Sequence, residues 1–207
     1  SKFDLSLNLP NKKQRIIKNF VIPLLGLHNI RNSVAAIAIG LTIGLSIQDI
    51  KNGLKNFKGV QRRFNKIFTY NKIDFYDDYA HHPTEIKEVL NGVKNVYNGY
   101  EKICIFQPHR ISRLKDLKKD FSHAFKEADE VVLLPIYTAG EKIKLGFKYL
   151  NFAKNLIKNS NVKLFLVNNK YQLANFVKKN IYGKKIVIAM GAGSISNWIR
   201  DLPKILK

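Results

Sequence analysis

Two short segments of this 207-residue chain combine histidine with arginine or acidic residues. In one of them, His109 and Arg113 are four residues apart, so a helix beginning near His109 would carry both on one face. A helix N-terminus also offers unpaired N–H donors, and the segment would then be a receptor for a carboxylate or phosphate. The alternative is a capping histidine followed by a surface arginine.

The other segment reads DDYAHHP over residues 77–83. Two acids before two histidines could form a metal site, and the acids could equally be a solvated turn. Adjacent residues on extended backbone point to opposite sides. We therefore expect at most one of His81 and His82 to act.

Three further groups are suited to a nucleotide. Arg62-Arg63 could reach a phosphate, because a guanidinium group binds phosphate in bidentate fashion. Asn29 and Asn32 could contact a nucleobase edge, or one could cap a helix while the backbone satisfies the other. The GAG string at 191–193 lacks the third glycine of the GxGxxG fingerprint and is more typical of a tight turn.

The elements that must position these groups alternate regularly in the second part of the chain. Strands are expected at 102–107, 130–135, 163–167 and 185–190. They contain the continuous apolar runs CIF, VVLL, LFLV and IVIA, which are typical of strands buried on both faces of a parallel sheet. Two strands before them are expected at 64–70 and 73–77. Helices are expected at 83–97, 112–127, 147–158, 170–180 and from about Ser194. This alternation predicts an α/β, doubly wound fold with a mostly parallel sheet, whose site lies beyond the carboxyl ends of the strands.

The first part of the chain has a different pattern. Alternation and β-branched residues predict strands at 3–9 and 15–22. Residues 28–44 are apolar on nearly every side, which predicts a buried helix. A second helix is expected to begin after Ser46, which is a suitable N-cap residue.

The charge of the chain has two interpretations. Lys and Arg number 36 against 15 Asp and Glu, which gives +21 and suits nucleic acid or an anionic small substrate. The lysines are dispersed singly and in pairs, so we keep a basic nucleic-acid-binding module only as the alternative to an enzyme. The longest apolar stretch, 33–45, is far short of the ~20 residues of a membrane span. The single cysteine, Cys104, excludes a disulfide framework and is expected in the core.

Six strings occur in an order that resembles the Mur ligases. They are HNIRNSVAA at 28–36, GVQRRF at 59–64, DDYAHHPTE at 77–85, FQPHRISR at 106–113, YTAGE at 137–141 and MGAG at 190–193. The family has a UDP-binding domain, a central ATPase domain and a Rossmann-like C-terminal domain. By this resemblance, residues 1–56 are the end of the central domain and residues 57–207 the third domain. The P-loop string GxxxxGK[ST] is absent from the sequence, so the chain looks like a C-terminal fragment that is inactive alone.

The resemblance also implies a cytoplasmic enzyme of peptidoglycan synthesis that uses ATP and Mg²⁺. ATP would phosphorylate the lactyl carboxylate of UDP-N-acetylmuramate, and the amine of L-alanine would then displace the phosphate. Asn29 and Asn32 would contact adenine, and Asp78 the ribose. Arg63 would neutralise the γ-phosphate. The Mg²⁺ ligands would belong to the part of the family's central domain that is not in this sequence.

On the amino-acid side, the resemblance implies roles for four residues. Arg113 would hold the carboxylate of L-alanine, because an arginine fork fits a planar carboxylate. His81 and His109 would line the site and take part in catalysis, with Tyr79 nearby. A related family member that attaches murein tripeptides shares the string at 77–83 and is the alternative within the family. The segment at 106–113 favours L-alanine.

Overall fold

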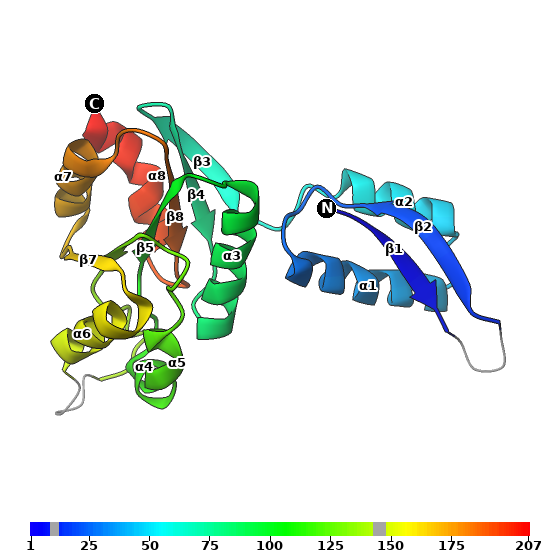
Figure 1. The fold of residues 1–207 in the computed structure, drawn as a ribbon, viewed down its shortest axis with the longest axis horizontal. Helices are drawn as coiled ribbons and strands as arrows, with labels where there is room; N and C mark the ends of the chain where they lie inside the picture. Colours follow the sequence, from blue (N-terminus) through cyan, green and yellow to red (C-terminus); the bar gives the residue numbers. More distant parts are fainter. Residues whose placement is uncertain (9–12, 143–147) are drawn as a thin grey trace. The chain divides into compact units, whose positions relative to one another are not determined.

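The computed structural model describes residues 1–8, 13–142 and 148–207, and Figure 1 shows its helices and strands. The chain folds into two compact units, Ser1–Val60 and Gln61–Lys207. Each unit has a hydrophobic core of its own.

The first unit combines a two-stranded antiparallel sheet with two helices. Its elements are β1 (Lys2–Leu7), β2 (Arg15–Val21), α1 (Leu27–Thr42) and α2 (Ile47–Asn56). The side chains buried in its core are Ile17, Phe20, Ile37 and Ile50. The Ser46 hydroxyl accepts a hydrogen bond from the backbone N–H of Asp49 (3.1 Å), so the predicted N-cap of α2 is confirmed.

The prediction that residues 28–44 form a helix buried on nearly every side is wrong. In α1 the buried residues are Ser33, Ile37 and Gly40, whereas Ile39 and Ile43 are 64% and 69% exposed. Two strands and one neighbouring helix cover only one side of a helix. The apolar pattern is therefore wider than the surface that this small unit can bury.

The second unit is built on a six-stranded sheet with the order β3-β4-β8-β5-β6-β7. Its strands are β3 (Asn65–Tyr70), β4 (Ile73–Asp78), β5 (Glu101–Phe106), β6 (Glu130–Leu133), β7 (Lys163–Leu166) and β8 (Lys185–Met190). All neighbouring pairs are parallel except β3 with β4. The predicted mostly parallel sheet is confirmed.

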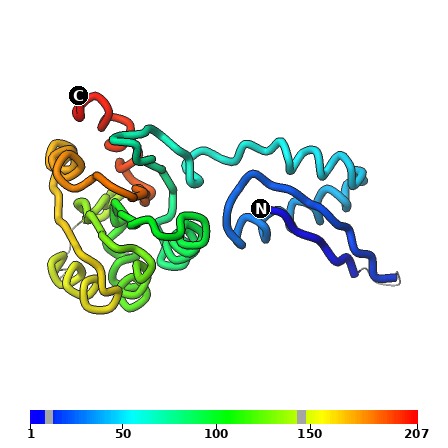
Figure 2. The backbone as a smooth tube through the Cα atoms, turned by 45° about the horizontal axis from the view of Figure 1, so that its top comes forward, coloured from blue at the N-terminus to red at the C-terminus, as the bar shows by residue number. Residues whose placement is uncertain are grey.

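Helices cover both faces of this sheet, which makes the unit doubly wound. They are α3 (Pro83–Val96), α4 (Ile111–Asp116), α5 (Lys118–Ser122), α6 (Tyr149–Ser160), α7 (Lys170–Asn180) and α8 (Ile195–Leu206). In Figure 2, the coils of α7 and α8 (orange to red) lie away from those of α3 to α6 (green to yellow). Alternate residues of one strand serve the two cores: Cys104 packs on one face of the sheet and Ile105 on the other. Burial raises the pKa of the Cys104 thiol well above its ordinary value, as expected for a core cysteine.

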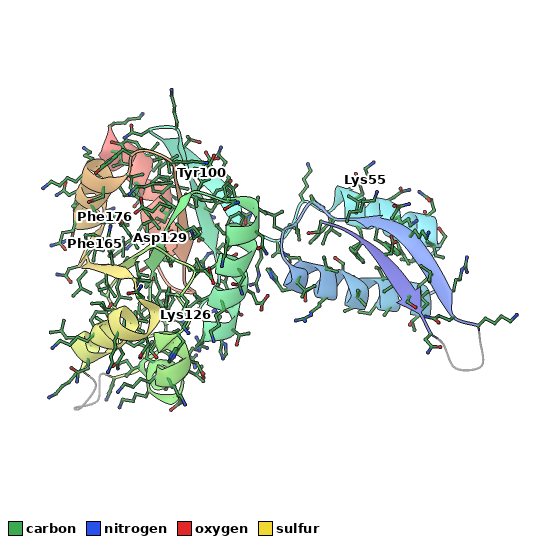
Figure 3. All side chains as sticks on the ribbon, in the orientation of Figure 1. Lys55, Tyr100, Lys126, Asp129, Phe165 and Phe176 are labelled. Carbon is green, nitrogen blue, oxygen red and sulfur yellow. The ribbon has the colours of Figure 1, made fainter. Side chains whose placement is uncertain are left out.

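Two predicted elements differ from the structure. Strand β7 lies at the sheet edge and is not buried on both faces: Leu166 is 45% exposed, while Phe165 packs on Phe176 of α7 with ring centroids 4.8 Å apart (Figure 3). An apolar run does not reveal whether a strand has one neighbour or two.

The single helix predicted over 112–127 is in fact two short helices, α4 and α5. After α5, the Ser122 hydroxyl and the ring Nδ1 of His123 lie 2.7 and 2.9 Å from the carbonyl oxygen of Lys119. Side-chain donors there compete with the backbone N–H that would continue the helix.

No helix formed by residues 1–8, 13–142 and 148–207 is both long and apolar enough to pass through a membrane.

Candidate functional site at the carboxyl edge of the sheet

Loops that follow four parallel strands meet at one edge of the second unit. They come after β4, β5, β6 and β8, and backbone hydrogen bonds join them. Gln107 N–H donates to the carbonyl of Met190 (3.0 Å), and Gly191 N–H donates to the carbonyl of Asp78 (3.2 Å). The loops therefore form one connected surface where the doubly wound fold places its ligands.

The histidines and the arginine singled out in the sequence come together on this surface. The ring centroids of His81 and His109 lie 5.6 Å apart, and Arg113 Nη1 lies 3.1 Å from His109 Nδ1. The Tyr79 ring is 5.2 Å from that of His81. On the other side, Tyr137 stacks on His109 at 5.6 Å. We call Tyr79, His81, His109 and Arg113 the histidine–arginine cluster.

Hydrogen bonds give the two histidines of the cluster opposite tautomers. A guanidinium group can only donate, so Nδ1 of His109 accepts from Arg113 and the neutral ring carries its proton on Nε2. Nδ1 of His81 lies 2.9 Å from the carbonyl oxygen of Tyr79, which can only accept, so Nδ1 carries the proton. Burial and then the charge of Arg113 lower the pKa of His109 below its ordinary value. His109 is therefore a neutral donor through Nε2 at pH 7, whereas His81 carries a proton on Nδ1, which also lies 3.3 Å from Glu85 Oε2.

The neighbouring His82 starts helix α3. Its Nδ1 accepts from the backbone N–H of Thr84 (3.3 Å), and Glu85 accepts from the backbone N–H groups of His82 (3.1 Å) and His81 (2.9 Å). Burial alone would raise the pKa of Glu85, but these donors bring it below its ordinary value. One histidine of the pair thus caps a helix while the other joins the cluster.

Arg62 and Asp77 form a buried ion pair beside the cluster. Arg62 Nε lies 3.3 Å from Asp77 Oδ2, which also accepts from the hydroxyl of Ser196 (2.6 Å). The Arg62 guanidinium donates in addition to the carbonyl of Gly191 and lies over the Tyr79 ring, 4.8 Å from its centroid. Asp77 is 0% exposed. Arg62 is therefore occupied by groups of the protein itself.

The neighbours of this ion pair, Arg63 and Asp78, differ from each other. The Arg63 side chain is exposed, and its backbone N–H donates to the side chain of Asn65 (3.0 Å). Asp78 is 3% exposed, and its carboxylate accepts the backbone N–H groups of Phe64 (2.8 Å) and Ala80 (2.7 Å). Arg63 is accessible to an anion, whereas Asp78 fastens its own loop.

The GAG string at 191–193 makes the tight turn between β8 and α8, as expected. At Gly191 the backbone φ is 150°, and a Cβ there would lie 2.8 Å from the carbonyl oxygen of Gln107. The Gln107 side chain also donates to the Ser194 hydroxyl (3.0 Å) and accepts from the backbone N–H of Ile195 (2.9 Å). Glycine is needed because two loops approach each other closely.

In the first unit, Asn29 and Asn32 lie near the start of α1. The Asn29 amide donates to the carbonyl of Leu25 (2.6 Å), and Asn32 is exposed. The N-cap of α1 is Gly26, so the idea that one asparagine caps the helix is wrong. The contact with a nucleobase stays a prediction for both residues.

Two residues that shape the carboxyl edge were not predicted as functional. Gln107 ties the loop after β5 to the start of α8, and the Glu141 carboxylate accepts from the backbone N–H groups of Ile111 (2.7 Å) and Ser112 (3.1 Å). Both lie inside strings that carry the family resemblance, which is the only signal the sequence offers for them. In the part of the chain that the structure describes, no three His, Cys, Asp or Glu side chains gather closely enough to hold a metal ion.

The fold and this edge define a class of protein: a doubly wound α/β unit with histidine and arginine side chains gathered at the carboxyl edge of its sheet. Residues 62–193 match the family model described as "Mur ligase, glutamate ligase domain". The match covers more than half of the sequence, and the chain belongs to this family.

Individual relatives agree with this assignment. The chain is 67% identical over 206 residues to the UDP-N-acetylmuramate–L-alanine ligase of Pelagibacter ubique, and 42% identical over 209 residues to that of Rickettsia bellii. These alignments cover 100% and 99% of the chain but 44% of each relative, so the chain spans less than half of their length. The solved UDP-N-acetylmuramate–alanine ligase of Thermotoga maritima superposes with a TM-score of 0.73 at 27% identity, over 92% of this chain and 42% of that one.

Proposed function

We propose that the chain supplies the C-terminal part of an ATP-dependent ligase that joins L-alanine to UDP-N-acetylmuramate through an acyl phosphate. The observation that carries the proposal is the 67% identity to the Pelagibacter ubique ligase along the whole chain. Residues 1–56 would then be the end of a central ATPase domain, and residues 57–207 would belong to the third domain. The alternatives, attachment of a murein tripeptide or binding of nucleic acid, have no comparable observation in their favour.

We assign the carboxylate of L-alanine to Arg113. Among the described residues Arg113 forms no ion pair with a carboxylate, so its charge is available to a ligand. His109 would donate from Nε2 to an oxygen of the substrate or of the tetrahedral intermediate. His81 would meet the incoming amine, and Tyr79 would close that side of the cluster. A guanidinium fork beside the neutral His109 ring suits an amino acid that must lose a proton before it attacks.

For ATP, we assign Arg63 to the γ-phosphate, because its side chain is exposed and phosphoryl transfer depends on neutralising charge. Asn29 and Asn32 would contact adenine. Asp78 would act at the ribose through the loop that its carboxylate holds in place. The described residues offer no acidic cluster for Mg²⁺, so we derive no step through the metal.

A chimera tests this proposal directly. This chain would replace the matching 44% of the Pelagibacter ubique ligase, and phosphate release would be followed with ATP, UDP-N-acetylmuramate and L-alanine varied one at a time. We expect release that requires all three. The unmodified relative is the positive control, and the isolated 207-residue chain, whose sequence has no P-loop, should give no turnover.

Two results would contradict the proposal. One is a chimera that still binds ATP but releases no phosphate with L-alanine while the unmodified relative is active. The other is a chimera that uses a murein tripeptide in place of L-alanine, which would assign the chain to the related ligase.

A further inference from the structure

Helix α4, which carries Arg113, begins without a local cap. Its N-cap residue is Arg110, whose side chain has no acceptor atom and makes no capping hydrogen bond. The backbone φ of Arg110 is 66°, a left-handed conformation that is uncommon for a residue other than glycine. The first N–H groups of α4 therefore need acceptors from elsewhere in the protein.

Glu141 supplies these acceptors from another loop, 29 to 30 residues further along the chain. Its Oε2 accepts from the backbone N–H groups of Ile111 (2.7 Å) and Ser112 (3.1 Å), and its Oε1 accepts from the Ser112 hydroxyl (2.6 Å). Ala139 and Gly140, with φ of 52° and 87°, turn the chain so that Glu141 faces α4. One carboxylate thus does for this helix what a local Ser or Asp does for most helices.

The same two loops are joined beside the cluster as well. Arg110 N–H donates to the carbonyl of Tyr137 (2.9 Å), and Tyr137 N–H donates to the carbonyl of Pro108 (2.8 Å). The Tyr137 ring stacks on that of His109. The loop at 137–141 therefore supports the segment from His109 to Arg113 at both of its ends.

We propose that Glu141 is a positioning residue, whose carboxylate holds the segment 109–113 in the conformation that presents His109 and Arg113 to an anion. Within the described ranges, no hydrogen bond joins Glu141 to the side chain of either residue, so it acts through the backbone of α4. That the anion is the carboxylate of an amino acid rests on the proposed function. The positioning role of Glu141 does not depend on the proposed function.

The proposal is testable because a positioning role and a purely electrostatic role of Glu141 predict opposite changes in the pKa of His109. His109 faces Arg113, His81, Arg110 and Glu141. Burial, and then Arg113, His81 and Arg110, lower the pKa of His109, whereas the Glu141 carboxylate raises it. Removing the negative charge would lower the pKa of His109 further if nothing moved. If Glu141 positions the segment, its loss lets the His109 ring and Arg113 separate and become hydrated, and the pKa of His109 rises toward its ordinary value of 6.5.

The experiment is an NMR titration of the 207-residue chain and of Glu141→Gln and Glu141→Ala. We expect the pKa of His109 to rise in both variants, more in the alanine variant. We also expect the amides of Ile111 and Ser112 to exchange with solvent about tenfold faster, the factor for losing one hydrogen bond of ordinary net strength. Asp116→Asn is the matched control, because it neutralises an exposed carboxylate on the same helix that does not bond to these amides.

A fall in the pKa of His109 together with unchanged exchange at Ile111 and Ser112 would overturn the proposal. Fluorescence of Trp198, the only tryptophan in the sequence, confirms that a variant is folded. A measurement on the unmodified chain needs no variant: the amide shifts of Ile111 and Ser112 should follow the titration of Glu141. Its pKa is below 4.5, because the Ser112 hydroxyl and the backbone donors stabilise the carboxylate. Amide shifts of Ile111 and Ser112 that do not change as Glu141 is protonated would also overturn the proposal.

Discussion

The two edges of the parallel sheet use charged residues in opposite ways. At the amino edge, the first residues of neighbouring strands pair acid with base: Glu101 with Lys185 (3.0 Å) and Glu130 with Lys163 (3.9 Å), each pair facing across the sheet register. At the carboxyl edge, histidine and arginine side chains lie against one another in the histidine–arginine cluster, and acidic side chains accept hydrogen bonds from backbone N–H groups.

This difference separates acids that pair with lysines of neighbouring strands from acids that hold backbone. At the amino edge, Glu101 and Glu130 each have a lysine partner on the next strand. At the carboxyl edge Asp77, Asp78 and Glu141 each accept hydrogen bonds that fix Arg62 or a loop. Under the proposed function, the anion that pairs with Arg113 would be the carboxylate of L-alanine.

The largest effect is expected from the buried acid at the carboxyl edge. Asp77→Ala should lower the free energy of unfolding of the second unit by roughly 3–5 kcal/mol, because it leaves the Arg62 charge partly buried without a partner. Asp129→Ala at the amino edge removes a half-exposed ion pair with Lys102 and the acceptor of the Lys102 backbone N–H (2.7 Å), and should cost about 1–2 kcal/mol. Urea denaturation followed by Trp198 fluorescence compares the two. Equal losses would break the distinction between the edges.

Glycines at the two ends of β8 give the next test. Gly191→Ala should destabilise the unit by roughly 2–4 kcal/mol, because its Cβ would strike the Gln107 carbonyl at a left-handed φ. Gly183→Ala, at the amino end of the same strand, has φ of 80° but no atom within 4 Å of the added Cβ, and should cost about 1 kcal/mol. The same denaturation assay measures both. A larger loss at Gly183 would show that close approach does not distinguish the carboxyl edge.

In the chimera, Arg113→Ala should chiefly impair the use of L-alanine. Losing one charge-assisted pair costs roughly 1.5–3 kcal/mol, or about 10–150-fold in the KM for L-alanine. Lys102→Ala at the amino edge should leave that KM unchanged. Phosphate release with L-alanine titrated is the measurement, and a wild-type KM in Arg113→Ala would remove Arg113 from the site.

The smallest effect concerns Glu130, which is 6% exposed and has one oxygen without a hydrogen-bond partner in the described structure. Burial raises its pKa above 4.5, despite the opposing charge of Lys185. Because the folded state binds this proton more tightly than the unfolded state, stability is lost as pH rises from 4.5 through the folded pKa. Glu130→Gln should therefore be more stable at pH 7 by about 1 kcal/mol, and equally stable at pH 4. Thermal melts at both pH values are the measurement. A Glu130→Gln variant that is less stable at pH 7 would show that the ion pairs of Glu130 outweigh the cost of burying its charge.

Much of the second unit could be predicted because its strands and helices are defined by local pattern. The apolar runs at β5, β6 and β8 gave buried strands, and Pro83 gave the start of α3. What local pattern does not contain is how fully neighbouring elements cover a strand or helix, which is why β7 was expected to be buried on both faces. For the same reason the apolar surface of α1 was expected to be buried.

The residues of the site also divide into those that sequence reasoning could predict and those that it could not. His81, His109 and Arg113 could be expected together because the carboxyl ends of parallel strands share one edge. Glu141 could not, because a carboxylate that caps a helix from a different loop leaves no spacing in the sequence. The sequence could not reveal the role of Arg62 either. Arg62 and Arg63 have the same side chain, and they differ because Arg62 forms an ion pair with Asp77 in the folded protein.

The place of β8 in the sheet has a consequence for how the protein folds during synthesis. This strand is the last of the described strands to be made, yet it lies between β4 and β5, about 110 and 85 residues earlier in the chain. Until residues 185–190 leave the ribosome, the hairpin of β3 and β4 cannot join the other parallel strands. Both halves then expose unpaired strand edges, which are sites of aggregation. Folding of the second unit should accordingly be late and slow, because its central pairings are the most distant ones.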